Sequence, residues 1–432
     1  MVKQHKNFQI IHTNDLELNH INIVRLGGEP EENGFNVGQA FRKPIQELYR
    51  FLFHPSRPVY WLTKQDIFRE VYEVTGNHIS DRYKDEMKGL AKGADIPLDW
   101  VHWAHILPTI TEHDGYSKKL FRNPKKLISH RKDVHGTSCS VIAATNTATK
   151  DGETWTYRGL DWMRWLDAQK SPLVLVYEFS EHNQNVSVLF SYAGFIGCIA
   201  GLNNQGLSYA EQGWADSDRE TIDGIPFPFI ARDSLTYSSN LEGAVDIFER
   251  SRRTCDFVHL IADGKSKQAK LLLADSVEMK EFGLGETVEA DYDLGPMKFP
   301  GIKDLIYSGM YDHVLYEILA ARHGQLDCDE MMKIAMDAAT NDAVQAVITR
   351  IPQEGSTEVW VANAQGRGIF PFGKRKGIAP HRPYLHFRLD DLLNGSTDLE
   401  KVYPPEYDPL TPEEKTVMMG VPEGRVYPHS IN

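Results

Sequence analysis

The chain has 432 residues, of which 41% are hydrophobic and 25% are charged. This length is enough for one large domain or two ordinary ones, and the composition is typical of a soluble globular protein. The formal net charge of −13 argues against a nucleic-acid partner, because a protein that binds phosphate backbones presents a basic face.

The cysteines are far apart in the sequence, at Cys139, Cys198, Cys255 and Cys328, and form no CxxC pair. We therefore expect neither a disulfide framework nor a zinc site. The 17 histidines contain no HxxxH or HExxH pattern, so we predict no metal and no cofactor. No apolar segment follows the first seven residues, and no stretch is apolar enough to span a bilayer. These features predict a cytoplasmic protein with no membrane partner.

The first third of the chain is predicted to start with strands and continue with helices. Residues 8–26 alternate polar and apolar character, as strands do, and glycine and proline in residues 26–38 are typical of a loop. Apolar residues recur at helical spacing in residues 41–53 and 67–91. Asp99 is predicted to cap the next helix. The basic residues of 113–135 indicate a solvated loop.

Strand patterns dominate after residue 139. A Lys150-Asp151-Gly152 turn joins two β-prone runs and predicts a hairpin that brings Cys139 close to Arg158 and Asp161. Further strands are predicted at 172–179, 186–190, 255–261, 269–274, 344–352 and 356–362. Helices are predicted at 233–250, with Asn240 as a possible cap, and at 307–323 and 328–339. Strand blocks separated by helix blocks favour layered packing, and the tail beyond residue 400 is predicted to be an extended surface segment.

Cys139 has two interpretations. In the first it is a nucleophile, because Arg158 would favour the thiolate and Asp161 could hold an ammonium or orient a proton carrier. In the second it is a small buried hydrophobic residue, and Arg158 and Asp161 form an ordinary surface pair. Spacing alone favours the second interpretation.

Several motifs change that balance. Cys139-Ser140 followed by residues 157–162 resembles the Cys-Thr/Ser … Gly-Arg-Asn-Leu-Asp-Phe/Tyr pattern of the cysteine N-terminal-nucleophile (Ntn) hydrolases. This group includes penicillin acyltransferase, acid ceramidase, N-acylethanolamine acid amidase and choloylglycine hydrolase. Residues 191–197 resemble its Ser-Phe-Ala-Gly-Tyr-Val-Gly, and residues 201–207 its Gly-Met-Asn-Glu-Lys-Gly-Leu. Residues 26–38 and 87–94 resemble passages that precede the nucleophile in this group, and the motifs occur in the same order.

The resemblance implies an α+β fold, the Ntn-hydrolase four-layer αββα sandwich preceded by a mainly helical N-terminal segment. Residues 1–138 would be the pro-segment or α-subunit. Residues 139–432 would form the catalytic domain, with an extended tail from about residue 400. Self-cleavage between Ser138 and Cys139 would free the α-amine of Cys139, which then acts as the base for its own thiol. Both subunits would come from one precursor, and a homo-oligomer is left open.

The implied activity is cleavage of a linear, non-peptide C–N amide bond through an acyl-thioester, ending in hydrolysis or acyl transfer. The substrate would be a small amide with a hydrophobic acyl or aryl group. The implied catalytic residues are Cys139, Arg158, Asp161, Asn203 and Asp291. The predicted substrate-binding residues are Trp162, Tyr192, Phe195 and Glu211.

Several of these residues have an alternative interpretation. Trp162, Tyr192 and Phe195 would line an apolar acyl pocket, or they would be core residues. Asn203 would donate to an oxyanion, or it would be an asparagine that tolerates positive φ in a glycine-bounded turn. Asp291 stands where the resembling Val-Glu-Thr-Asn-Tyr-Asp passage has a catalytic asparagine, and an ionised carboxylate cannot donate a hydrogen bond. Burial would have to keep it protonated, unless the alignment is shifted or the chemistry differs.

Other functional hypotheses remain. An uncleaved pseudoenzyme or small-molecule binding protein fits Asp291, the lack of a matching arginine after it, and serine rather than glycine before Cys139. A papain-type thiol hydrolase fits less well, because its Cys/His signature is absent from the sequence.

Overall fold

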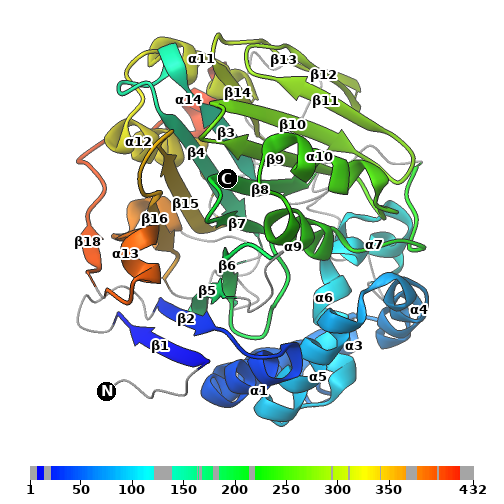
Figure 1. Ribbon diagram of the computed structural model, residues 1–432. Helices are drawn as coiled ribbons and strands as arrows, with labels where there is room; N and C mark the ends of the chain where they lie inside the picture. The colour runs from blue at the N-terminus through cyan, green and yellow to red at the C-terminus, as the bar shows by residue number, and fades with distance from the viewer. Residues whose placement is uncertain are drawn as a thin grey trace.

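The computed structural model describes most of the chain and has mixed α+β architecture (Figure 1). The described residues are 7–13, 21–120, 139–162, 164, 168–178, 184–213, 219–292, 295–309, 312–340, 342–365, 377–396 and 398–418. Two large β-sheets lie at the centre, and helices pack around them.

The larger sheet has nine strands within the described residues, in the order β1-β2-β5-β6-β7-β8-β9-β10-β11. The bounds are β1 Phe8–His12, β2 Asn22–Leu26, β5 Pro172–Tyr177, β6 Ser187–Tyr192, β7 Ala200–Asn203, β8 Leu207–Gly213, β9 Phe257–Asp263, β10 Gln268–Ala274 and β11 Met279–Gly283. Strand β2 pairs with β5 in parallel, so the N-terminal strands extend a sheet built by the second part of the chain.

The smaller sheet has seven antiparallel strands within the described residues, in the order β14-β3-β4-β15-β16-β17-β18. The bounds are β14 Leu305–Gly309, β3 Ser140–Ala144, β4 Thr154–Asp161, β15 Ala343–Ile351, β16 Glu358–Asn363, β17 Tyr384–Arg388 and β18 Glu400–Val402. The predicted hairpin of Cys139 is confirmed as the β3–β4 pair. Strands β12 (Val288–Tyr292) and β13 (Gly295–Phe299) form a separate hairpin.

The two sheets pack face to face. Val174 and Val176 of β5 share an apolar cluster with Val347 of β15 and Val361 of β16, whereas the alternating Leu175 belongs to a cluster on the other side of the larger sheet. Strands buried on both faces need apolar residues at every position, which explains the unbroken apolar run of β5.

Helices cover the outer face of each sheet. Helices α9 (Phe227–Tyr237) and α10 (Leu241–Arg250) contact β7 to β10 of the larger sheet. Helices α11 (Asp312–Ala321) and α12 (Cys328–Ala338) contact β14, β4 and β15 of the smaller sheet. Two shorter helices follow, α13 (Leu389–Leu393) and α14 (Pro412–Met418).

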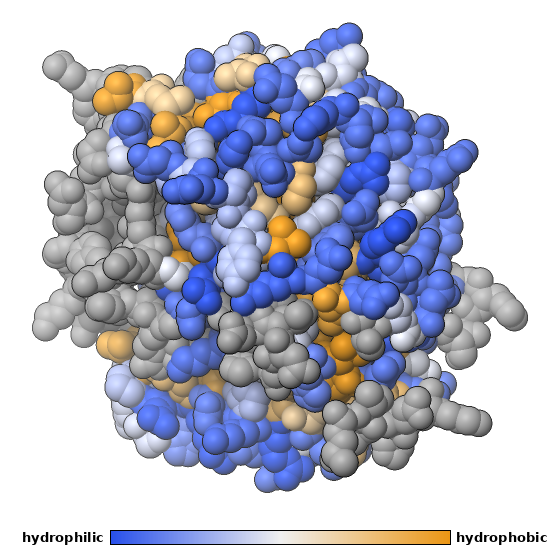
Figure 2. All heavy atoms as spheres, turned by 90° about the vertical axis from the view of Figure 1, so that its left-hand side faces the viewer, coloured by the Kyte–Doolittle hydropathy of each residue, from blue (hydrophilic) through white to orange (hydrophobic). Residues whose placement is uncertain are grey.

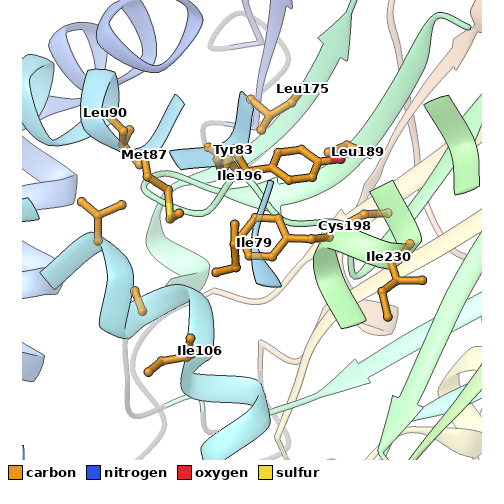
Figure 3. Close-up of a cluster of buried hydrophobic side chains, with 14 of the residues drawn as sticks. Ile79, Tyr83, Met87, Leu90, Ile106, Leu175, Leu189, Ile196, Cys198 and Ile230 are labelled. Atoms are coloured by element: carbon orange, nitrogen blue, oxygen red, sulfur yellow. The ribbon is translucent and has the colours of Figure 1, made fainter. Parts of the chain in front are cut away.

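The N-terminal helices pack beside α9 and share its core. They are α1 (Pro30–Ala40), α2 (Arg42–Phe53), α3 (Pro58–Leu62), α4 (Gln65–Thr75), α5 (Asp81–Ala94), α6 (Leu98–Glu112) and α7 (Asp114–Leu120). Figure 3 shows part of this core, in which Met87 and Ile106 from the N-terminal helices belong to the same cluster as Leu175 and Leu189 from the strands and Ile230 from α9.

Helices α1 and α5 cross with their backbones in direct contact. A Cβ atom on Gly34 of α1 would lie 1.9 Å from the carbonyl oxygen of Glu86, and one on Gly89 of α5 would lie 1.9 Å from that of Glu31. Gly38 and Gly93 show the same close approach one turn further along. Residues 26–38, for which a loop is the alternative interpretation, are therefore helical from Pro30 onward, and Gly34 and Gly38 serve helix packing.

Several predicted boundaries are wrong. The helix predicted at 67–91 is two helices, interrupted by the 3₁₀ turn Gly76–His78. Asp99 lies in the first turn of α6, where its charge favours the helix dipole, and Pro97 holds the N-cap position. The helix predicted from Asp233 begins at Phe227, and a second one starts after Asn240, which caps it as predicted.

Two further corrections concern the last third of the chain. Tyr307, predicted to begin a helix, lies in strand β14, and helix α11 starts at Asp312. The tail after residue 400, predicted to be an extended surface segment, contains helix α14, whose Lys415 is buried. Of the basic segment 113–135, residues 114–120 are helical and residues 121–135 lie outside the described residues.

In the described part of the chain, none of the helices has the length and apolar character needed to cross a membrane. Figure 2 shows one face of the molecule as mainly hydrophilic, with apolar side chains in small groups.

Candidate active site

Cys139 lies immediately before β3, and the hairpin register determines its neighbours. Ser140 pairs with Gly159 and Val141 with Arg158, so one further step puts Cys139 opposite Leu160, with Asp161 next along β4. Residues that lie opposite each other in a sheet share a face, so Cys139 lies on the same face as Leu160. Alternate residues of a strand also share a face, so Arg158, two residues before Leu160, lies on that side as well. The Cys139 side chain is fully buried in an apolar cluster with Leu160.

Arg158 forms a buried ion pair that joins the two sheets. Its Nη2 donates to Oε1 of Glu211 on β8 at 2.6 Å, and both side chains are almost completely buried. Burial acts to lower the pKa of Arg158, but Cys139, Glu211 and Tyr192 outweigh it and raise that pKa. The guanidinium therefore stays charged next to the Cys139 sulfur, as a thiolate or an oxyanion would require.

Polar atoms without hydrogen-bond partners gather around Cys139. Within the described residues they include Nε and Nη1 of Arg158, Oε2 of Glu211 and the hydroxyl of Tyr192. Oδ1 of Asp161, the residue after Leu160 on β4, also lacks a partner. Leaving one such buried group unsatisfied costs about 1–3 kcal/mol, so folded proteins rarely collect several in one place. The atoms beside Cys139 are therefore free to bond with water or with polar atoms of a ligand.

Asp161 is held by the turn that follows α12. Its Oδ2 accepts a hydrogen bond from the backbone N–H of Thr340 at 3.0 Å. Burial raises the pKa of Asp161 to about 7, and the hydrogen bonds from Thr340 oppose that shift. A carboxyl group with this pKa can change its charge near neutral pH.

An apolar cavity of about 90 Å³ lies beside this group, between the N-terminal helices and the ends of the strands. Its wall includes Leu48 and Leu52 of α2, Leu107 of α6, and Phe227 and Phe257 from the second part of the chain. The four predicted substrate-binding residues, Trp162, Tyr192, Phe195 and Glu211, all line it. The cavity can accept an apolar group next to the polar atoms described above.

Residues 192–195 form part of the cavity wall, and the N-terminal helices hold this segment. The hydroxyl of Tyr49 donates to the carbonyl oxygen of Gly194 at 2.5 Å, and the N–H of Ile196 donates to Nε2 of His105 at 2.9 Å. Burial lowers the pKa of His105 to about 4, so the ring is neutral, with its Nδ1–H donating to the Val101 carbonyl. Sequence reasoning missed this role, because its only signal is a lone histidine in an apolar helix.

Asn203 lies outside the cavity and has its amide fully engaged. Its Nδ2 donates to the carbonyl oxygens of Leu235 and Ser238, and its Oδ1 accepts from the N–H groups of Gln205 and Leu207. The positive φ expected in this turn belongs to Gly206 rather than to Asn203. This geometry ties the β7–β8 turn to α9 and offers no amide hydrogen to a substrate.

The remaining predicted residues are only partly described. Asp291 pairs with Pro296 in the β12–β13 hairpin, but its side chain lies outside the described residues, and so does Ser138. No group of three or more His, Cys, Asp or Glu side chains in the described residues is arranged to hold a metal ion.

Comparison with known proteins gives distant similarities, and no family model matches the chain. Protein dcd1A of Dictyostelium discoideum is 22% identical over 420 residues, which cover 87% of this chain and 86% of that protein. Protein dcd1B of the same organism is 23% identical over 311 residues, or 67% of this chain, and the match spans only 57% of dcd1B.

Two solved structures are similar at low scores. A Caenorhabditis elegans ortholog of N-acylethanolamine-hydrolyzing acid amidase is 15% identical with a TM-score of 0.37, over 50% of this chain and 94% of that one. A mutant of conjugated bile acid hydrolase from Clostridium perfringens is 10% identical with a TM-score of 0.34, over 62% of this chain and 97% of that one. At these values the similarities assign no activity to this chain.

Proposed function

We propose that this protein is a cysteine Ntn amidohydrolase that cleaves a small linear amide through Cys139. The observation that carries the proposal is the grouping of Cys139, the buried Arg158–Glu211 pair and several unsatisfied polar atoms beside an apolar cavity. The motif resemblance to the cysteine Ntn hydrolases supports the same assignment. The packing of two sheets with a helix pair outside each fits the four-layer αββα sandwich of that group.

The mechanism begins with hydrolysis of the Ser138–Cys139 peptide bond, in which water supplies the new carboxylate of Ser138 and the α-amine of Cys139 is freed. That amine takes the thiol proton, and the sulfur attacks the carbonyl carbon of the amide. The C–N bond then breaks, the leaving amine takes the proton, and an acyl-thioester remains. Water, or an acceptor amine, attacks the thioester and restores the thiol.

Arg158 and Asp161 have separate parts in this scheme. The Nε and Nη1 hydrogens of Arg158 would stabilise the negative charge on sulfur and on the oxyanion. Oδ1 of Asp161, which has no hydrogen-bond partner, would accept from the α-ammonium of Cys139. Asn203 is not given the oxyanion role, because its amide is occupied, and a role for Asp291 stays a prediction from the resemblance.

The cavity supports a substrate with an apolar acyl or aryl group. Most of its lining is aliphatic or aromatic, and two of its polar residues, Tyr192 and Glu211, are also among the groups around Cys139. An acyl chain in the cavity would leave the amide carbonyl close to the sulfur. The N-terminal helices form part of the wall, so residues 1–138 would remain part of the enzyme after cleavage.

The first test is the intact mass of the purified protein under denaturing conditions. We expect two fragments, residues 1–138 and 139–432, and a single full-length mass for Cys139→Ala, which should also lose at least about 10³-fold in amide hydrolysis. Cys328→Ala, which changes a thiol in α12, serves as the control and should cleave and turn over normally. Turnover by Cys139→Ala would exclude the mechanism.

The alternative is an uncleaved binding protein on the same fold, favoured by Asp291 at the position of a catalytic asparagine. In that case the wild-type protein would show one full-length mass and no selective labelling of Cys139 by iodoacetamide or a β-lactone. Binding of acyl amides without turnover, measured by calorimetry, would then assign the cavity to ligand binding.

A further inference from the structure

A single peptide group connects Asp161 with a lysine from the C-terminal tail. The Nζ of Lys415 donates to the carbonyl oxygen of Ala339 at 3.1 Å, and the N–H of Thr340 donates to Oδ2 of Asp161 at 3.0 Å. This C=O and this N–H belong to the same peptide bond. A cation at the carbonyl oxygen polarises the amide and strengthens the hydrogen bond that its N–H donates.

The position of Lys415 is unusual for a lysine. The residue is only 2% exposed, although lysine is rarely buried without a specific partner because removing its charge from water is costly. The charge therefore needs a compensating interaction, and the Ala339 carbonyl at the C-terminal end of α12 lies where a helix dipole favours cations.

Specific contacts fix the tail that carries Lys415. The N–H of Leu410 and the hydroxyl of Tyr407 both donate to the buried carboxylate of Asp337 on α12, at 2.9 and 2.7 Å. Thr411 and Glu414 form a reciprocal capping box at the start of α14. Lys415 is the next residue, so the cap sets its position on the helix.

We propose that Lys415 is a positioning residue that acts through the Ala339–Thr340 peptide to keep Asp161 ionised and oriented toward the main-chain nitrogen of Cys139. The inference rests on the proposed function, in which Asp161 accepts from the α-ammonium of Cys139. It assigns the C-terminal tail a part in the active site, although α14 follows Cys139 by more than 270 residues.

The charged and titratable groups facing Asp161 determine the direction in which its pKa shifts. Burial and the charge of Asp342 raise the pKa of Asp161, whereas the Thr340 hydrogen bonds and Lys415 lower it; Tyr157 on β4 also interacts with this carboxyl. Because the folded pKa lies above the usual value, this carboxyl stabilises the fold at low pH. That stabilisation is lost as the pH rises through about 7.

The test compares Lys415→Gln, which keeps a donor without the charge, with Lys415→Arg. The free energy of unfolding is measured from pH 4 to 9 for the wild type and for each Lys415 variant, once with Asp161 and once with Asp161→Asn. The difference between the two free energies at each pH reports the titration of Asp161 alone. We expect Lys415→Gln to move this titration upward by about one pH unit and Lys415→Arg to leave it near the wild-type position. Lys333→Gln, a change of a partly exposed lysine on α12, is the control.

The same variants are assayed for self-cleavage and amide turnover against pH. The acid limb of the Lys415→Gln profile should shift upward, with about tenfold lower rate near pH 6 and recovery near pH 9. An unshifted Asp161 titration, or an equal loss at every pH, would overturn the proposal. If the Asp161 titration shifts but the wild-type protein shows no amide turnover, Lys415 still acts on Asp161 and the proposed function is rejected.

A second variant covers the case in which Lys415→Gln does not fold. Thr411→Ala combined with Glu414→Ala removes the capping box and loosens α14 while keeping Lys415. An unshifted Asp161 titration in this variant also overturns the proposal.

Discussion

Arg158 and Glu211 show how one residue pair serves both stability and chemistry. Each side chain is almost completely buried, and each comes from a different sheet. A buried pair of this kind is costly to desolvate and is stable only while both partners are present. The retention of charge in such a place fits a functional role for the pair better than a packing role.

Removing one partner should therefore be much more harmful than removing both. We expect Glu211→Ala to lower the free energy of unfolding by about 3–5 kcal/mol, because it leaves the Arg158 guanidinium unpaired in the interior. The double variant Arg158→Met with Glu211→Leu should recover most of that loss while remaining inactive. Urea unfolding and amide turnover measure the two effects separately.

Glu281→Ala is the matched control, because Glu281 pairs with Lys270 in a partly exposed bridge on neighbouring strands. We expect a change of at most about 1 kcal/mol there. If Glu211→Ala lowered the free energy of unfolding by no more than Glu281→Ala does, the Arg158–Glu211 pair would be solvated and would not hold charge at the site.

At the scale of elements, the α1–α5 crossing determines how the N-terminal helices sit on the larger sheet. Gly34 and Gly38 of α1 face Gly89 and Gly93 of α5, with no space for a side chain between the backbones. Helix α5 also carries Glu86, whose carboxylate accepts from Arg232 of α9 at 2.7 Å and from Tyr177 of β5 at 2.6 Å. The glycines therefore bring a buried charge to its partners.

Adding one methyl group at this crossing should separate the helices. Gly34→Ala and Gly89→Ala should each lower the free energy of unfolding by about 2–4 kcal/mol, since the new Cβ would overlap a carbonyl oxygen. In Gly115→Ala of α7 the new Cβ meets only the His113 side chain at 3.3 Å, and this control should be neutral or slightly stabilising. Thermal melts of the three variants make the comparison, and equal melting temperatures would exclude direct backbone contact.

At the scale of the whole molecule, residues 1–138 and 139–432 interpenetrate. The parallel β2–β5 pair, the Arg232–Glu86 ion pair and the shared core all join the two parts. The cavity wall also takes residues from both, so neither part has a complete site alone.

After cleavage before Cys139, the two fragments should for this reason stay bound to each other. We expect a tag on the N-terminal fragment to retain the C-terminal fragment during affinity purification and native size exclusion. Separation should require denaturant, because it would expose the apolar core that the two parts share and would break the Arg232–Glu86 ion pair. Dissociation of the fragments in dilute buffer would contradict this picture.

Local signals in the sequence predicted much of the second half of the fold. The β3–β4 hairpin follows from its turn and its β-prone runs, and the Asn240 cap follows from the asparagine before Leu241. Boundaries failed where a helix began without a strong cap, as at Phe227, or where glycines had a tertiary purpose, as at Gly34. Glycine indicates a loop or a close helix contact equally well when only the sequence is considered.

The sequence by itself determined the hairpin that brings Cys139 close to Arg158, because strands that follow each other directly along the chain pair through local contacts. Only the tertiary structure decided that Glu211 pairs with Arg158, that Asn203 is engaged by α9, and that Lys415 reaches the peptide behind Asp161. These contacts join residues far apart along the chain, and they form only when the sheets and helices pack together. No local pattern encodes them, because each depends on the position of an element that the rest of the molecule supports.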